Sequence, residues 1–377
     1  MIVWSYGTVM RIIREEETLQ EVEVRVGEKD LSAALNYPQL TGRIEPGEKV
    51  IMNTTAVELG LGSGGKHFVS ARIGADGQPI IDAEAAQCGH IIKLRYTPFQ
   101  HAVQTAEEGK IIAESLDTAE KALKQTPVII GETHSMLPAF VLSIRYLSQR
   151  EGEGKMPRIC YIMSEGGALP LALSDHIRHL QSLGLLVGTI TYGHTFGGQT
   201  ECVNLYTALL AARFVWEADM IVIMPGPGIV GTGTALGFSG MEQVAIIETV
   251  HKLGGIPILI PRVSRADSRE RHAGISHHTA TVLRFVRNTP LLLNLEQNPE
   301  LIAQIGEQSR HHTLILHDPL NREEWQAIEA SYPGSLTTMG RTAEEDPAFF
   351  VHTYYAARLA QSQYEKREAV RKMDLFA

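Results

Sequence analysis

The sequence contains few cysteines, and their arrangement excludes the common cysteine-based scaffolds. Its 377 residues include only Cys88, Cys160 and Cys202. The odd number, the wide spacing and the lack of a CxxC motif argue against a disulfide framework or a zinc ribbon. A chain of this length can bury a full apolar core without either device. Free cysteines are typical of a reducing compartment, so the sequence predicts a cytoplasmic protein.

Long apolar runs and an excess of positive charge are also missing. No stretch approaches the ~18 uninterrupted apolar residues that would suggest a membrane span, and the start of the chain lacks the features of a secretory signal. The formal net charge is −9, whereas proteins that coat nucleic acid normally carry a basic face. We therefore expect neither a membrane nor a nucleic acid as partner. The oligomeric state stays open, a homo-oligomer included.

Several standard catalytic motifs are absent as well. The sequence has no G-x-S-x-G, no GxxxxGK[ST] and no HEXXH. These absences leave a hydrolase nucleophile elbow, a P-loop and a zincin-type metal site unsupported. Ser135 follows a strand-like run and precedes a helical one, as an elbow serine would, but no glycine flanks it. It is a minor nucleophile candidate.

The first part of the chain, residues 1–104, has the pattern of a β-rich domain. The alternating runs VWSYGTVMRII and LQEVEVRVGE are joined by the polar REEET, which predicts a hairpin. GEKVIMNTTAV, HFVSARIG and HIIKLRY are further strand candidates, and several short strands at close spacing predict a small barrel or sandwich. An amphipathic helix is expected over 105–125, within a helical linker that spans 105–126.

From residue 127 to about 345, apolar strand-like runs alternate with helical patterns. This alternation is typical of an α/β domain with a mostly parallel, doubly wound sheet. A helical tail is expected over 346–377. The expected strands are 127–131, 158–163, 185–191, 219–224, 256–260 and 312–317, and the expected helices are 136–149, 171–183, 201–213, 239–253, 277–287 and 321–331.

Five successive expected strands lead into loops rich in Gly, Ser, Thr, His and charged residues. These loops are ETHSML, SEGGALP, YGHTFGGQTE, PGPGIVGTGTALGFSG and PRVSRADSRERHAGISHHT. In open α/β sheets, ligands bind outside the carboxyl ends of the strands. We therefore expect the loops to converge on one cleft, with the functional site between about residues 164 and 279.

The loop 225–240 is unusually rich in glycine, which lets a backbone approach a ligand closely. Successive N–H groups at a helix start can bind an anion, so we expect an anion cradle, with a tight structural turn as the alternative. GPGIVG matches the dinucleotide pattern G-x-G-x-x-G, but a proline separates its first glycines and Arg262 stands where an acid is expected. The ligand-binding candidates in this loop are Gly226, Gly228, Gly231, Thr232, Gly233, Thr234 and Ser239.

The segment 262–279 concentrates arginine and histidine in an acidic chain. Arginine suits bidentate contact with phosphate or carboxylate, and histidine suits proton transfer at neutral pH. A solvated surface loop is the alternative. We predict Arg262, Arg269 and Arg271 as ligand-binding residues and Asp267, His272, His277 and His278 as catalytic residues.

The stretch YGHTFGGQTECVN adds two catalytic candidates, His194 on a glycine loop and Glu201 on the opening turn of a helix. Glu201 and Asn204 would share one face of that helix, although such a pair can merely cap it. His272, His277 and His278 could also be metal ligands, because with His194, Glu201, Asp267 or His134 they would supply enough N and O donors for zinc, manganese or iron. No defensible metal-ligand spacing occurs, so metal and cofactor stay unknown.

A second glycine-rich segment, GLGSGG at 60–65, follows NTTAVELG in the β-rich part. Strand-like residues follow it instead of a helix, so we interpret it as a hairpin or flap loop. We expect Asn53, Thr54, Thr55 and Glu58 beside it to be able to close over the main cleft.

Five motifs together are similar to an uncharacterised bacterial family, domain of unknown function 3866. They are NTTAVELGLGSGGKHF, SEGGALPLALSD, GHTFGGQTECVN, GPGIVGTGTALGFSGMEQ and RVSRADSRERHAGISHHT. The resemblance extends over nearly the full length. It implies a bacterial cytosolic protein and implies no particular activity.

The sequence thus predicts an enzyme that acts on a small anionic metabolite, with phosphorylated compounds favoured. Transfer or hydrolysis are the preferred reaction classes. Two other functions fit the same residues: a non-catalytic nucleotide- or metabolite-binding module, and a metal-dependent hydrolase.

Overall fold

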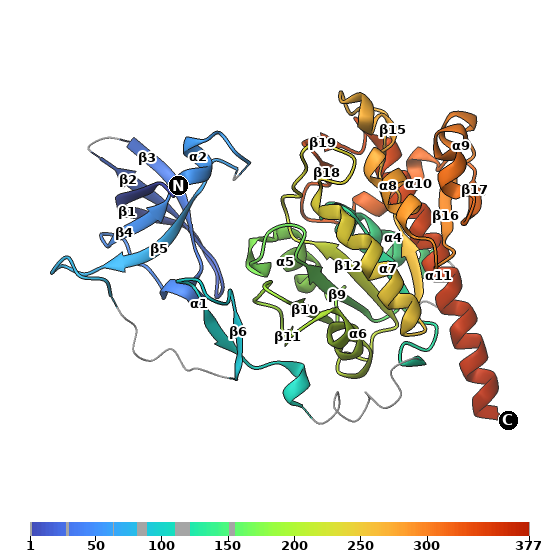
Figure 1. The fold of residues 1–377 in the computed structure, drawn as a ribbon, viewed down its shortest axis with the longest axis horizontal. Coiled ribbons are helices and arrows are strands. Elements are labelled where there is room, and N and C mark those ends of the chain that lie inside the picture. Colours follow the sequence, from blue (N-terminus) through green and yellow to red (C-terminus); the bar gives the residue numbers. More distant parts are fainter. Residues whose placement is uncertain are drawn as a thin grey trace. The chain divides into compact units, whose positions relative to one another are not determined.

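The computed structural model describes residues 2–27, 30–62, 64–80, 89–109, 121–150 and 155–376. The chain divides into two compact units, Met1–Val103 and Gln104–Ala377, each of which is described here by itself (Figure 1). Within the described residues, no helix has both the length and the apolar character that a membrane crossing requires.

The first unit is a closed five-stranded barrel with the strand order β1-β2-β3-β5-β4. Its strands are β1 (Trp4–Glu15), β2 (Gln20–Val26), β3 (Asp30–Asn36), β4 (Lys49–Asn53) and β5 (His67–Ile73). β1 closes the barrel by pairing with both β2 and β4, and β3 pairs with β5 in parallel. Alternate residues point inward, among them Val9, Val22, Val24, Val50 and Met52, and form a small core. The expected hairpin and the small barrel are confirmed.

The short elements of this unit are α1 (Pro38–Thr41), α2 (Thr55–Glu58) and the antiparallel pair β6 (Ile91–Lys93) and β7 (His101–Val103). Gly7 in β1 is required by packing, because a Cβ there would lie 2.2 Å from Cγ1 of Val24. The expected flap residues lie in β4 and α2 of this unit, while Ser63 of GLGSGG is outside the described residues. Closure of this loop over the predicted cleft stays a prediction.

The second unit contains a six-stranded, all-parallel sheet with the order β11-β10-β9-β12-β8-β13. This confirms the expected α/β class. Its strands are β8 (Pro127–Ile130), β9 (Ile159–Ser164), β10 (Gly188–Tyr192), β11 (Thr200–Cys202), β12 (Met220–Pro225) and β13 (Ile256–Leu259).

Successive residues of these strands supply two separate cores, one on each face of the sheet. Tyr161 and Val222 pack on one face with α4, α5, α10 and α11, whereas Ile162 and Ile223 pack on the other with α6, α7, α8 and α9. Figure 1 shows α7 and α6 over the sheet and the long α11 running to the C-terminus. The helices are α4 (Met136–Arg150), α5 (Asp175–Ser182), α6 (Leu205–Phe214), α7 (Glu242–Lys252), α8 (His277–Phe285), α9 (Pro299–Ile305), α10 (Arg322–Glu329) and α11 (Pro347–Phe376).

Three small sheets complete this unit. β14 (Val263–Ser264) pairs with β15 (Gly274–Ile275), β16 (Leu292–Glu296) with β17 (Thr313–His317), and β18 (Thr337–Thr338) with β19 (Arg341–Thr342). The expected strand 312–317 therefore exists as β17, but it pairs with β16 outside the main sheet. The apolar run that forms β16 was not anticipated.

Other expected elements differ in their bounds. The helix expected over 201–213 begins only at Leu205, because residues 200–202 add a short edge strand to the sheet. The helix expected over 171–183 begins at Asp175, where Ser174 caps it. In the linker expected to be helical, Ala106–Glu108 form one 3-10 turn, and residues 110–120 lie outside the described residues.

Candidate functional site

The sheet has a topological switch at two adjacent strands, β8 and β12. The helix that follows β8 packs in the core on one face, while the helix that follows β12 packs in the core on the other. The loops after these strands therefore diverge, which is the arrangement at which open parallel sheets bind ligands. The loop after β8 begins with Gly131 and Glu132, and the loop after β12 is the glycine-rich segment 226–240.

Glu132 lies at the centre of a buried charge cluster at this edge. Its Oε1 accepts hydrogen bonds from Nη1 of Arg262 at 2.8 Å and from Nδ1 of His278 at 2.5 Å. Only 2% of the Glu132 side chain is exposed. Burial would raise the pKa of this carboxyl, but the hydrogen bond from His278 and the charge of Arg262 outweigh it and lower the pKa. Glu132 is thus a buried carboxylate that fixes both an arginine and a histidine.

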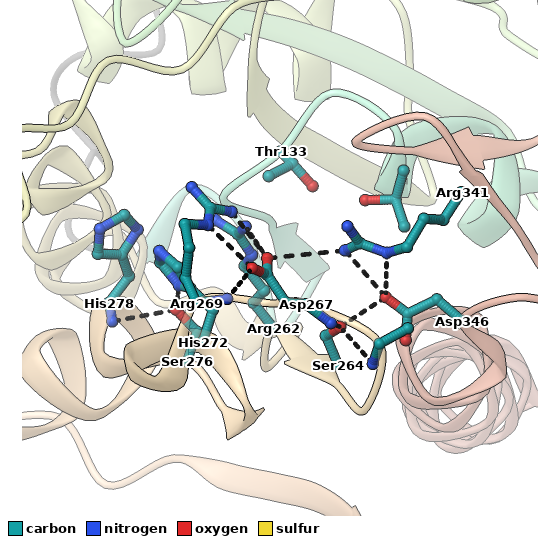
Figure 2. A network of polar contacts seen from close by, with 12 residues as sticks. Thr133, Arg262, Ser264, Asp267, Arg269, His272, Ser276, His278, Arg341 and Asp346 are labelled. Carbon is teal, nitrogen blue, oxygen red and sulfur yellow. Dashed lines mark hydrogen bonds and ion pairs between the residues drawn. The ribbon is translucent and has the colours of Figure 1, made fainter.

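A second carboxylate, Asp267, connects three arginines (Figure 2). Arg269 forms a bidentate pair with it at 2.9 and 2.7 Å, and guanidinium nitrogens of Arg262 and Arg341 lie 3.6 Å from its Oδ2. Arg341 also pairs with Asp346 at 3.1 Å. The hydrogen bonds from Arg269 lower the pKa of Asp267 well below its usual range. A carboxylate held in this way stays ionised, so it suits positioning and not proton transfer.

The local fold explains how this segment returns to the sheet edge. β14 and β15 pair with each other, so the residues between them form a loop with fixed ends. Ser276 then starts α8, and its Oγ accepts the N–H of His278 at 3.2 Å. The same Oγ lies 2.8 Å from Nδ1 of His272. Pairing and capping together fold His272 back onto the first two residues of α8.

His272, His277 and His278 form a cluster of three imidazoles. Their ring centroids are 4.3 to 5.0 Å apart, and one potential ligand atom from each lies within 4.8 Å of the others. Burial first, and then the charges of Arg262 and Arg269, lower the pKa of His272 to about 4. Burial also lowers the pKa of His277. The lowered pKa values favour the neutral form of both imidazoles.

The glycine-rich loop lies against this cluster. Phe238 stacks on the His278 ring with a centroid distance of 3.7 Å, and a Cβ at Gly231 would lie 3.8 Å from Cε1 of the same ring. A Cβ at Gly233, whose φ is 82°, would lie 3.5 Å from Cζ of Arg271. The structure thus brings the two segments with the strongest sequence signals together.

The helix expected over 239–253 is present as the 3-10 turn Ser239–Met241 followed by α7, and the glycines of GPGIVG precede it in a loop. Gly231 pairs with Phe238 in an isolated antiparallel bridge, and α7 begins only at Glu242. The glycine N–H groups therefore do not form the first turn of a helix, which removes the dinucleotide geometry. The expected hydroxyls brace the loop: Thr232 donates to the Gly237 carbonyl, Thr234 accepts the Gly237 N–H, and Ser239 accepts the Val230 N–H.

The three predicted arginines differ in whether they form an ion pair within the protein. Arg262 is 4% exposed and pairs with Glu132, and Arg269 pairs with Asp267. Arg271 is exposed and forms no ion pair with a carboxylate of the described residues. It is the arginine best placed to meet a ligand anion.

The structure places the predicted residues His194 and Glu201 elsewhere along the sheet edge. Glu201 lies in β11 and not on a helix; its carboxylate accepts the Gly197 N–H and the Thr191 hydroxyl, both at 2.7 Å. It therefore braces the loop that carries His194. The expected shared helical face with Asn204 is wrong, because Asn204 is the N-cap of α6.

A largely buried carboxyl that the sequence did not reveal lies on this second side. Glu242, in the first turn of α7, accepts the Ser164 hydroxyl at 2.5 Å. Burial, with a further contribution from Glu165, raises the pKa of Glu242 to about 7. Glu165 in turn accepts the His194 N–H at 2.5 Å. These contacts tie together the loops after β9 and β10 and the start of α7.

Another histidine group borders a hollow of about 300 Å³ at the carboxyl ends of the strands. Nδ1 of His134 lies 3.0 Å from the Pro225 carbonyl, and its Nε2 lies 2.5 Å from the Ser174 hydroxyl. Since the carbonyl can only accept, Nδ1 carries the proton and Ser174 donates to Nε2. The minor candidate Ser135 contacts only Thr133 and Thr338 through hydroxyls.

Sequence reasoning missed several members of the site. Glu132 is the first residue of the loop ETHSML, which follows an expected strand, so its position could have indicated a site residue. Arg341 and Asp346 lie in a segment without a clear alternation of strand-like and helical patterns, and only the tertiary fold brings them close to Asp267. Glu242 resembles any acidic residue in the first turn of a helix.

Comparison with known proteins gives one result that spans most of the chain. The model of a family described as proteins of unknown function, DUF3866, matches residues 33–357. No curated protein matches the chain. The match covers both structural units and every residue of the charge and imidazole clusters. The chain therefore belongs to the DUF3866 family of proteins of unknown function.

Proposed function

We propose that this protein is an enzyme that binds a small anionic metabolite, bearing phosphate or carboxylate, between the glycine-rich loop and the arginine- and histidine-rich segment. The observation that carries the proposal is the position of Arg271. Its exposed guanidinium group lies near the backbone of Gly233, in the loop whose Phe238 stacks on the His278 ring. An arginine that is free of protein carboxylates can form a bidentate contact with an oxyanion.

The other charges of the site support a positioning role. Asp267 holds the bidentate pair with Arg269, and Glu132 holds Arg262, so both arginines are fixed before a ligand arrives. Preorganised hydrogen-bond donors stabilise negative charge that develops in a transition state without reorganising first. The lowered pKa values of His272 and His277 favour neutral imidazoles, which can accept a proton from a reacting group. Transfer or hydrolysis at the anionic group fits this arrangement.

The compartment is part of the same proposal. Cys160 is a free cysteine that is fully buried among apolar residues. A buried free cysteine suits a reducing environment, and we propose that the protein lies in the cytoplasm of a bacterium.

The test is a ligand screen on the metal-free full chain by thermal unfolding, with inorganic phosphate, pyrophosphate, citrate, sugar phosphates and nucleotides. A ligand at 100 times its dissociation constant adds about 2.7 kcal/mol to the free energy of unfolding. We expect a phosphorylated or carboxylated hit that is lost in Arg271→Ala and partly kept in Arg271→Lys. Arg310→Ala, at an exposed arginine that pairs only with Glu307, is the matched control.

Incubation of the hit with the protein separates an enzyme from a binding module. Conversion of the compound, followed by mass spectrometry, supports the enzyme. A bound compound that is recovered unchanged supports the non-catalytic module. Binding that is equal in Arg271→Ala and wild type would overturn the proposed site.

A further inference from the structure

The geometry points to a divalent metal site of the zinc class at His272, His277 and His278. Three imidazoles from two elements meet at one point: His272 lies in the 3-10 turn Glu270–His272, and the other two open α8. Their potential ligand atoms lie within 4.8 Å of one another. In a tetrahedral zinc site, with Zn–N bonds near 2.0–2.1 Å, such nitrogens are about 3.3 Å apart. Small side-chain rotations would close that difference.

The hydrogen bonds around the cluster orient the rings as metal sites require. Glu132 is a carboxylate, so Nδ1 of His278 donates to it and the lone pair of that ring is on Nε2. A carboxylate behind a ligating histidine is the usual outer partner in zinc sites and fixes the ring and its tautomer. Ser276 Oγ lies 2.8 Å from Nδ1 of His272 and accepts its hydrogen when that nitrogen carries the proton, which is the tautomer that leaves Nε2 for a metal.

An unsatisfied atom is the second, independent sign of a ligand. Nε2 of His277 is buried and has no hydrogen-bond partner among the residues that the structure describes. Leaving a buried polar atom unpaired is unfavourable, and a metal ion held by the three rings would remove this cost.

The charges around the cluster permit a cation. Arg262 is compensated by Glu132, and Arg269 by Asp267. The remaining positive group, Arg271, is exposed and lies at the glycine-rich loop. Three protein ligands leave one coordination position open, which is typical of catalytic and not of structural zinc. Such an ion would act as a Lewis acid beside the bound anion. This chemical role rests on the proposed function, whereas the site itself does not.

The test is metal binding by the full chain, in buffer without phosphate or carboxylate. After treatment with a chelator, the protein is titrated with Zn²⁺ by calorimetry and with Co²⁺ by visible absorption, which reports tetrahedral coordination. We expect one equivalent of each. In His277→Ala we expect the Co²⁺ band to vanish and the Zn²⁺ affinity to fall by more than the ~100-fold upper range for loss of an outer-shell partner.

The control is His311→Ala, which removes an exposed histidine of the same unit and is expected to bind both metals as wild type does. The His277 ring is only partly buried, so its variant is expected to fold, and circular dichroism checks this. Folded wild type that binds no Zn²⁺, or equal binding in His277→Ala, would overturn the site.

Arg271→Ala separates this proposal from the proposed function. If it binds Zn²⁺ normally but no anion, both proposals stand. If wild type binds metal at the three histidines and no anion at all, the metal site stands and the proposed function fails.

Discussion

At the scale of single residues, the most informative group is Glu132. One buried carboxylate fixes Arg262 and His278 at the same time, and both partners are themselves less than a tenth exposed. Removing one member of such a group leaves an uncompensated buried charge, which is costly even where the intact group adds little net stability. The site therefore depends on Glu132 although no ligand need touch it.

We predict that Glu132→Ala lowers the free energy of unfolding by about 3–5 kcal/mol, because Arg262 would stay buried without its carboxylate. Urea unfolding measures the change. Glu307→Ala is the control, since 80% of that side chain is exposed, and we expect a change below about 0.5 kcal/mol. A loss below about 1 kcal/mol for Glu132→Ala would contradict the buried charge cluster.

Glu242 gives the protein a predictable dependence on pH. Its pKa rises from an ordinary 4.5 to about 7 because of burial. The native state therefore keeps a proton that the unfolded chain releases between these values. The contribution of this carboxyl to stability is full below pH 4.5 and is lost as the pH rises to about 7.

We predict that Glu242→Gln, which cannot ionise, gains stability relative to wild type between pH 5 and 8. The gain should reach at most about 3 kcal/mol, at 1.36 kcal/mol per unit of pKa. Urea unfolding of both proteins at four pH values measures it. Glu300→Gln, at an exposed residue, is the control, and its free energy of unfolding should change with pH in parallel with that of wild type. A Glu242→Gln curve that is also parallel would contradict the buried protonated carboxyl.

At the scale of elements, the loops after β9 and β12 are fitted to each other through glycine. A Cβ at Gly167 would lie 2.1 Å from the carbonyl oxygen of Gly226. The obstacle is backbone and not a flexible side chain, so the loops would have to move apart. Gly226 begins the glycine-rich loop that lies against the imidazole cluster. A displacement of Gly226 would therefore also move the loop that borders the proposed site.

We predict that Gly167→Ala destabilises the protein by about 1–3 kcal/mol, as overpacking does. It should also weaken the binding of the anionic hit, because the loop over Arg271 shifts. Thermal unfolding and calorimetric titration measure the two effects. His311→Ala, at an exposed residue of the second unit, is the control and should change neither quantity. Unchanged anion affinity in Gly167→Ala would show that the loop does not form the binding site.

At the scale of the whole molecule, the two units have separate cores. The barrel core consists only of residues from the first unit, while the two cores beside the parallel sheet consist only of residues from the second. Each unit thus buries its own apolar surface, which is the condition for independent folding.

We predict two transitions in calorimetric unfolding of the full chain. Met52→Ala, in the barrel core, should lower the free energy of unfolding of the first unit by about 2–5 kcal/mol. It should lower the midpoint temperature of the smaller transition only. Met10→Ala, at a side chain that is 40% exposed, should leave both transitions in place. A single transition that shifts with Met52→Ala would show that the units unfold together.

The sequence by itself determined the α/β class, the barrel and the segments that carry the site. Buried parallel strands need continuous apolar runs and barrel strands need alternation, and both patterns are local. The glycine-rich loop and the arginine–histidine segment were visible for the same reason. Tertiary structure decided which charges are occupied and which are free. Arg262, Arg269 and Arg271 look alike in sequence, but Arg262 pairs with Glu132, which is distant in the chain, and Arg269 pairs with the nearby Asp267. The sequence also offered His272, His277 and His278 as possible metal ligands, although their spacing fits no metal motif. Strand pairing and the Ser276 cap, which fold His272 onto α8, bring the three rings together.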